Sequence, residues 1–188
     1  VNLRGWHTLC RTMTPLQVTQ AQERYLSAVF ACAREEKGVV DFFSGDRVLV
    51  TFNAVSSCAG HPRRAANAAY AIRARLCEAN AAAAAGGGVP ALLVTAGISS
   101  GNALVGNVGS SDAKRFNVMG TVYSEAIRLE QVARGDAMAR ELGQAPILVH
   151  RKCLAECVQD YTVQFLGVAS LDGTGDAATR SLYAALET

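Results

Sequence analysis

The chain of 188 residues is long enough for one domain with its own core; half of its residues are hydrophobic and 18% are charged. A net charge of +2, with no Lys/Arg block longer than a pair, argues against a nucleic-acid groove. No apolar run reaches the ~20 residues of a membrane helix, and no signal peptide opens the chain. Because the chain begins without an initiator Met, we expect a single cytoplasmic domain over residues 1–188, taken from a longer protein in which any membrane anchor lies elsewhere.

The cysteines and histidines form no metal-binding pattern. Cys153 and Cys157 share one helical face, but no second pair of ligands completes a zinc site. The three histidines are far apart in the sequence, which favours surface or helix-end roles. The chain is neither short nor rich in cysteine, so we predict reduced thiols in an intracellular compartment. The six cysteines are Cys10, Cys32, Cys58, Cys77, Cys153 and Cys157.

Helical periodicity predicts a first helix from Thr14 to about Arg34. Thr14 can cap this helix, Pro15 suits its first position, and Gln17 completes a capping box. Its apolar face consists of Val18, Ala21, Tyr25, Ala28, Val29 and Cys32.

A β-hairpin and a second helix are expected next. The apolar runs at 39–43 and 47–52 flank the turn residues 44–46, which is typical of a hairpin. A second helix starts at His61 and fades into an Ala-rich stretch and a low-complexity loop at 86–88. The apolar face of this helix consists of Ala65, Ala69, Ile72 and Leu76.

The second half of the chain mixes strands with one clear helix. A short helix is also expected around Cys153. The pattern indicates an α+β fold: a ferredoxin-like mixed sheet with helices packed on one face. The predicted strands are 91–99, 103–108, 147–150, 161–166 and 182–186, and the predicted helix is 119–132.

Six short motifs punctuate the chain. They are 3–6 (LRGW), 43–52 (FSGDRVLVTF), 97–101 (GISSG), 105–109 (VGNVG), 118–120 (VMG) with 126–130 (AIRLE), and 165–173 (FLGVASLDG). Each motif alone is a weak signal, because Gly-rich turns between strands are common. In this order and at this spacing, they resemble the class III adenylyl/guanylyl cyclase catalytic domain over nearly the whole chain.

The resemblance implies a defined chemistry. In this family the ribose 3′-hydroxyl of ATP or GTP attacks the α-phosphate, and pyrophosphate leaves. Two divalent cations, Mg²⁺ or Mn²⁺, activate the hydroxyl and hold the phosphates, and hard cations of this kind prefer carboxylate ligands. An Asn and an Arg stabilise the transition state, one Lys holds the triphosphate, and a Lys with an Asp reads the purine. The sites lie between two domains packed head to tail, so the family works as dimers.

The positions for metal and base binding are partly altered here. The first metal position falls on Asn2, a neutral amide, and the second falls on Asp46, a carboxylate. The purine-reading Lys position falls on Phe42 and its partner on Asn117. Three residues next to the first metal position are also expected to contact substrate: Leu3, Arg4 and Gly5.

The positions for catalysis and phosphate binding are altered as well. The transition-state Asn position falls on Ser124, which can still donate a hydrogen bond, while Arg128 keeps the expected type. The triphosphate Lys position falls on Asp172, an anion where the polyphosphate requires a cation.

Three functions remain open. The favoured one is a degenerate copy, a pseudo-cyclase with little or no turnover that acts through a head-to-tail homodimer or a heterodimer with another cyclase domain. The alternative is an active adenylyl or guanylyl cyclase with a two-metal mechanism. The third is an unrelated α+β binding module, which a structure with Asn2 and Asp46 on non-adjacent strands would favour.

Overall fold

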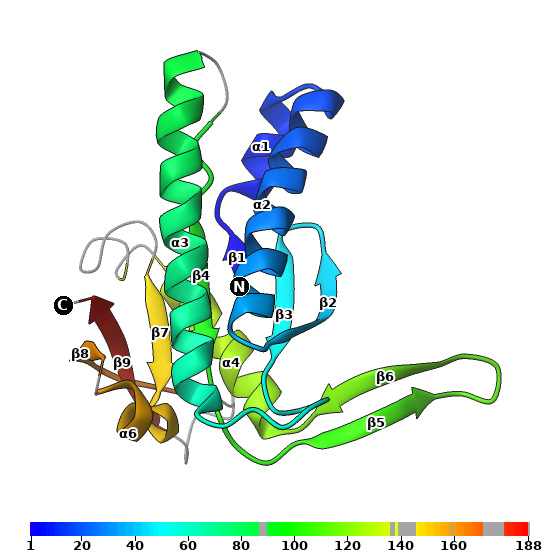
Figure 1. The fold of residues 1–188 in the computed structure, drawn as a ribbon, viewed down its shortest axis with the longest axis vertical. Helices are drawn as coiled ribbons and strands as arrows, with labels where there is room; N and C mark the ends of the chain where they lie inside the picture. Colours follow the sequence, from blue (N-terminus) through cyan, green and yellow to red (C-terminus); the bar gives the residue numbers. More distant parts are fainter. Residues whose placement is uncertain (87–89, 136–137, 139–145, 159, 171–178, 188) are drawn as a thin grey trace.

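The computed structural model describes residues 1–86, 90–135, 138, 146–158, 160–170 and 179–187. Within these ranges, seven strands form one sheet in the order β2-β3-β1-β4-β7-β9-β8, and two more form a separate hairpin (Figure 1). The strands of the sheet are β1 (Asn2–Leu3), β2 (Val39–Ser44), β3 (Arg47–Thr51), β4 (Val94–Ile98), β7 (Ile147–His150), β8 (Tyr161–Ser170) and β9 (Thr179–Glu187). The hairpin strands are β5 (Leu104–Gly109) and β6 (Lys114–Met119).

The helical elements separate these strands along the chain. They are α1 (Trp6–Thr12), α2 (Pro15–Glu35), α3 (His61–Gly86), α4 (Thr121–Ala133), the 3-10 helix η1 (Arg151–Cys153) and α6 (Leu154–Cys157). The capping box predicted for α2 is present: Thr14 Oγ1 accepts from the Gln17 backbone, and the Gln17 side chain accepts from the Thr14 backbone. None of the described helices is long and apolar enough to cross a membrane.

The sheet is mixed, as predicted. β1 is antiparallel to both of its neighbours, β3 and β4, whereas β4 and β7 run parallel. β9 lies between β7 and β8 and is antiparallel to both. The short β1 therefore lies inside the sheet, and the first metal position predicted from the sequence lies on this strand.

The helices cover both faces of the sheet, which differs from the one-face packing predicted from the sequence. Alternate residues of β4 point in opposite directions. Val94, Ala96 and Ile98 join the core clusters that contain residues of α3. Thr95 hydrogen-bonds to Glu130 of α4, and Gly97 lies against the backbone of α4. This second layer could not be predicted from the sequence, because both contacts use small or polar residues.

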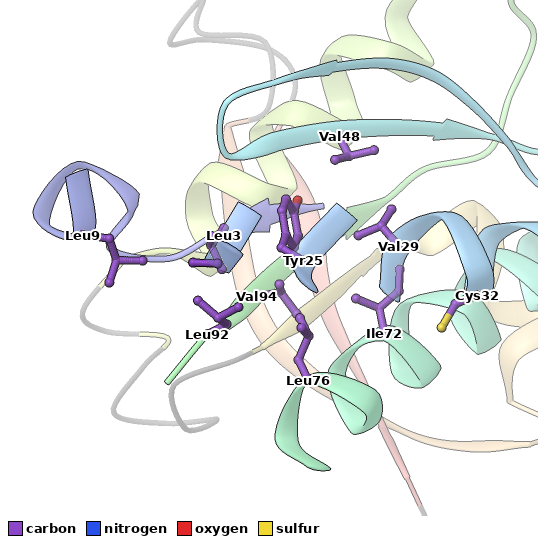
Figure 2. Packing of buried hydrophobic residues seen from close by; sticks show 11 residues of the cluster. Leu3, Leu9, Tyr25, Val29, Cys32, Val48, Ile72, Leu76, Leu92 and Val94 are labelled. Carbon is purple, nitrogen blue, oxygen red and sulfur yellow. The ribbon is translucent and has the colours of Figure 1, made fainter. Parts of the chain in front are cut away.

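The main core lies where α2 and α3 pack on β1, β3 and β4, and Figure 2 shows its side chains. Tyr25 and Val29 of α2 have no exposed surface, and Ile72 of α3 is 1% exposed. The buried cluster consists of Leu3, Leu9, Ala21, Tyr25, Val29, Cys32, Val48, Ile72, Leu76, Leu92 and Val94. All six cysteines are free thiols in the structure, four of them buried.

Four elements differ from the prediction. The helix α1 was not predicted, and α3 extends further than predicted. Alanine has the highest helix propensity, so the Ala-rich stretch continues α3 to Gly86. β6 was not predicted, because its sequence KRFNVM carries three polar side chains in six residues. β9 (Thr179–Glu187) is longer than the predicted strand 182–186 and lies inside the sheet. The hairpin of β5 and β6 extends away from the sheet (Figure 1).

Candidate functional site

The two predicted metal positions lie on adjacent strands. Val1 and Val48 exchange two backbone hydrogen bonds, Asn2 pairs with Arg47, and the Leu3 N–H donates to the Asp46 carbonyl at 2.8 Å. This arrangement counts against the unrelated binding module. Residues directly opposite in an antiparallel pair point to the same face, so Arg47 shares a face with Asn2.

Asn2 is a poor replacement for a metal-binding aspartate. Its side chain is buried at 1% exposure, and neither its amide oxygen nor its nitrogen has a hydrogen-bond partner among the described residues. An amide oxygen can bind a cation, but it contributes no negative charge, and Arg47 adds a positive one to the same face. Within the described ranges, no three His, Cys, Asp or Glu side chains are placed to hold a metal ion. The residues present do not fit a pair of Mg²⁺ or Mn²⁺ ions.

Asp46 lies in the turn between β2 and β3, above a buried tyrosine of α2. The Tyr25 hydroxyl donates to the Asp46 carbonyl at 3.0 Å and also approaches the Val1 carbonyl at 3.3 Å. Burial raises the pKa of Tyr25 far above its usual value, and the charges of Asp46 and Glu130 raise it further. The phenol therefore remains a neutral donor that fixes the turn, and the turn fixes the position of the Asp46 carboxylate.

Three of the predicted site residues line a cavity of about 380 Å³. Phe42 comes from β2, Asn117 from β6, and Ser124 from the start of α4. Its lining does not include Asn2, Asp46 or Arg128. The full lining is Asp41, Phe42, Leu49, Arg115, Asn117, Val118, Met119, Gly120, Tyr123 and Ser124. The structure thus brings together the predicted base-binding positions and the transition-state position.

Arg128 lies one helical turn after Ser124, and both side chains are exposed on α4. The Arg128 guanidinium donates to Gln131 Oε1 at 3.2 Å. Residues four apart lie on the same face of a helix, so Ser124 and Arg128 can act on one ligand, as the resemblance implies.

Two buried carboxylates attach α4 to the sheet, and sequence reasoning missed both. Glu130 Oε1 accepts from the buried Thr95 hydroxyl at 2.9 Å and forms an ion pair with Arg134 Nε at 2.8 Å. Glu125, which lies five residues before Glu130 in α4, belongs to a second polar cluster. Glu125 Oε2 accepts from Ser99 Oγ at 2.7 Å. A visible signal was that Glu125 and Glu130 flank the apolar Leu129 on a helix that must cover the sheet.

His150 and Lys152 complete the second cluster. His150 Nε2 lies 4.0 Å from Glu125 Oε2, and Lys152 Nζ lies 3.8 Å from Glu125 Oε1. His150 has no exposed surface, so the predicted surface role is wrong. The predicted helix-end role is confirmed, since His150 Nδ1 accepts from the Lys152 N–H at 3.3 Å at the start of η1.

The remaining predicted substrate contacts are divided between core and surface. The Leu3 side chain belongs to the main core at 1% exposure and is not available to a ligand. Gly5 is exposed in a left-handed conformation (φ 68°) that ends β1 and starts α1, and the Arg4 N–H donates to the Leu93 carbonyl at 2.7 Å. Asp172 lies outside the described residues.

No family model matches the chain. Adenylate cyclase 1 of Rhizobium meliloti (strain 1021) is 27% identical over 170 residues, which cover 90% of this chain and 24% of that protein. The chain therefore spans about a quarter of the length of this curated relative.

Two solved cyclase structures share the fold of this chain. The adenylyl cyclase CyaB from P. aeruginosa superimposes with a TM-score of 0.86 at 21% identity, covering 100% of this chain and 91% of that one. The guanylyl cyclase Cya2 superimposes with a TM-score of 0.77 at 22% identity, covering 98% and 87%. The predicted α+β class and the resemblance to class III cyclase domains are confirmed.

Proposed function

We propose, from the premise that the chain has the class III nucleotidyl cyclase fold, that it is a catalytically impaired cyclase domain that acts through dimerisation. Cyclases of this fold use divalent metal ions when they are active. The alternative is an active adenylyl or guanylyl cyclase that forms cAMP or cGMP and pyrophosphate.

One observation carries the proposal: the first metal position holds a buried neutral amide with an arginine directly opposite it. The loss of one charge pair at ~4 Å removes about 4 kcal/mol at an effective dielectric near 20. That loss corresponds to roughly three decades in rate. Asp46 is then the one carboxylate left at the two metal positions, and a single carboxylate is insufficient to hold two cations.

A heterodimer does not rescue the chain, because neither half-site is complete. The metal half lacks one of its carboxylates. The nucleotide half keeps Arg128, has the shorter Ser124 in place of Asn, and has Asp172 in place of the triphosphate Lys. A partner domain supplies only the opposite half of each shared site, so both composite sites inherit a defect from this chain.

The first prediction concerns turnover. The 188-residue chain, at high protein concentration with ATP or GTP and excess Mn²⁺, is expected to form cyclic nucleotide at the rate of a protein-free control, because the metal pair is not held. Product is measured by chromatography with mass detection over several hours. Formation that is linear in time and proportional to protein concentration would establish the active alternative.

A calorimetric control accompanies this assay. Titration with Mn²⁺ and a non-hydrolysable ATP analogue is expected to show no binding that depends on the metal. Tight metal-dependent binding would contradict the impaired site even if no product formed, because it would show that the site still holds a metal–nucleotide complex.

The hairpin of β5 and β6 supports the dimerisation part of the proposal. It extends from the sheet (Figure 1), and an isolated two-stranded hairpin with exposed apolar side chains is marginally stable without a covering surface. Its exposed large apolar residues are Leu104 (67%), Val105 (36%), Val108 (38%) and Phe116 (37%).

The second prediction tests this surface. The double variant Leu104→Ser/Phe116→Ser is expected to weaken self-association by about tenfold or more, because buried aromatic and aliphatic anchors dominate interface energies. Sedimentation equilibrium over a range of concentrations measures the effect. The matched control is Leu16→Ser/Val158→Ser, which removes exposed apolar residues (67% and 55%) outside the hairpin. Equal association constants for the two double variants would remove the hairpin from the interface.

A further inference from the structure

The sheet has an opening between β3 and β4, next to the short strand β1. β1 separates these two strands over Asn2 and Leu3, and both strands continue past it, to Thr51 and Ile98, with none of the described strands between them. A second cavity, of about 350 Å³, lies in this opening and is lined by β3, β4, α3 and α4. We infer that this cavity is the binding site of one extended apolar segment that continues the line of β1, formed in the longer protein by the residues directly before Val1.

On β3, the backbone of Val50 is directed into the cavity. Val1 and Val48 exchange two backbone hydrogen bonds, and the Leu3 N–H donates to the Asp46 carbonyl. In an antiparallel pair the backbone groups of alternate residues face the same neighbouring strand. Val50 is therefore the next residue of β3 whose N–H and C=O face the line of β1, and it lines the cavity.

On β4, the same alternation selects Gly97. The Arg4 N–H donates to the Leu93 carbonyl on the side of β1, whereas the Ala96 N–H donates to the Pro146 carbonyl on the side of β7. The N–H and C=O of Gly97 consequently face the line of β1. Backbone groups inside a protein require hydrogen-bond partners, so a ligand placed between β3 and β4 is favoured if it has peptide groups of its own.

The side chains around the opening form two separate core clusters on the face of the sheet covered by α3. One cluster contains Val48 and the other contains Ile98, and Val1 packs against both. Side chains two residues apart along a strand share a face. The second residue before Val1 would therefore lie on this face, between Val50 and Ile98, where a large apolar side chain would join the two clusters.

The helices on both sides leave room for apolar side chains. Ala65 and Ala69 of α3 line the cavity on one face of the sheet, and Ala126 and Ile127 of α4 line it on the other. A strand that is covered by helices on both faces is apolar throughout and does not alternate with polar residues. The chemistry of the site thus selects a continuous apolar run in an extended conformation.

The line of β1 identifies the occupant. A segment joined to Val1 enters the cavity without a loop, because it continues a strand that is already antiparallel to β3 and β4. A covalently attached segment also avoids the entropy cost that a separate peptide pays on association. Since Asn2 follows Val1 directly, a strand held in this cavity would fix the position of the first metal position from the sequence analysis.

The test extends the 188-residue chain before Val1 by four residues, in three variants. Thr-Val-Ile-Val places an isoleucine second before Val1, opposite Val50. Thr-Val-Pro-Val is the matched control, apolar but without an N–H at that position. Thr-Ser-Asn-Ser is the polar control. All three variants replace the α-amino group of Val1 by a peptide bond, so this change is common to them.

The apolar extension is expected to lower the equilibrium constant for unfolding in urea by about tenfold or more relative to either control, because it buries a large side chain and pairs its backbone. Amide hydrogen exchange gives the site-specific measurement. Protection is expected to rise more at Val50 and Gly97 than at Ala96, whose N–H already has a partner.

Three results would overturn the inference. Equal unfolding constants for the three variants would show that the cavity does not accept a strand. Stabilisation without added protection at Val50 and Gly97 would place the extension elsewhere on the molecule. Unprotected Val50 and Gly97 amides in the longer protein would show that its own residues before Val1 do not occupy the cavity. None of these measurements depends on nucleotide turnover, so this inference and the impaired-cyclase proposal fail separately.

Discussion

Replacement of Gly97 by alanine is expected to destabilise the fold by about 3 kcal/mol or more. A Cβ at this position would meet the backbone of α4 at the Ala126 carbonyl oxygen and the Glu130 nitrogen, and also Leu129 Cβ. Backbone atoms cannot move aside as a flexible side chain can, so α4 as a whole must shift away from β4. The free energy of unfolding in urea measures the loss.

The matched control is Gly106→Ala in β5, where an added Cβ meets nothing within 4 Å. This change is expected to leave stability unchanged or to raise it by up to about 1 kcal/mol, because alanine loses less conformational freedom on folding than glycine does. The opposite signs separate close packing from a general preference for glycine. Equal unfolding free energies for the two variants would show that α4 does not lie against Gly97.

Gly97 also shows how far a motif can be interpreted. The segment GISSG is one of the six motifs whose order predicted the fold, and the likeness to the adenylyl cyclase CyaB confirms that prediction. The sequence did not reveal that the first glycine is required by a helix that lies about thirty residues later in the chain. Such a contact depends on which face of β4 the later helix covers, and local periodicity contains no information on that choice.

The site was predicted unevenly for the same reason. Phe42, Asn117 and Ser124 were placed by motif spacing, and they do line one cavity. Asp41 was overlooked because an alternating strand would turn it away from Phe42, and a bulge cannot be seen in the sequence VVDFFS. Arg115 was overlooked because β6 itself was not predicted. Both omissions arise from local backbone geometry that depends on strand pairing.

The burial of several polar residues was also not predicted from the sequence. His150, Glu125 and Glu130 are charged or polar types that are usually exposed, yet each is at most 5% exposed here. The burial of Glu130 and Glu125 depends on partners such as Thr95 in β4 and Ser99 directly after it. A single sequence does not identify these partners, because the pairing is a product of the completed fold.

The helix α4 packs one large buried apolar side chain, Leu129, against β7 and β9, and its removal is the second large effect expected. Leu129 has no exposed surface and packs with Ala133, Leu148 and Ala184. Leu129→Ala is expected to lower the free energy of unfolding by about 2–5 kcal/mol, because the buried methyl groups leave a cavity between rigid neighbours. A loss of that size is a substantial part of the ~5–15 kcal/mol that stabilises a typical domain.

Leu16→Ala is the control, since Leu16 is 67% exposed outside the hairpin and its truncation is expected to change stability by less than about 0.5 kcal/mol. Hydrogen exchange distinguishes local from global loss: Leu129→Ala is expected to reduce amide protection in α4 more than in α2, because α2 packs in a separate core cluster. Equal loss of protection in both helices would mean that the two clusters unfold as one unit. In that case the face of α4 that carries Ser124 and Arg128 could not be loosened while the cyclase fold around it persists.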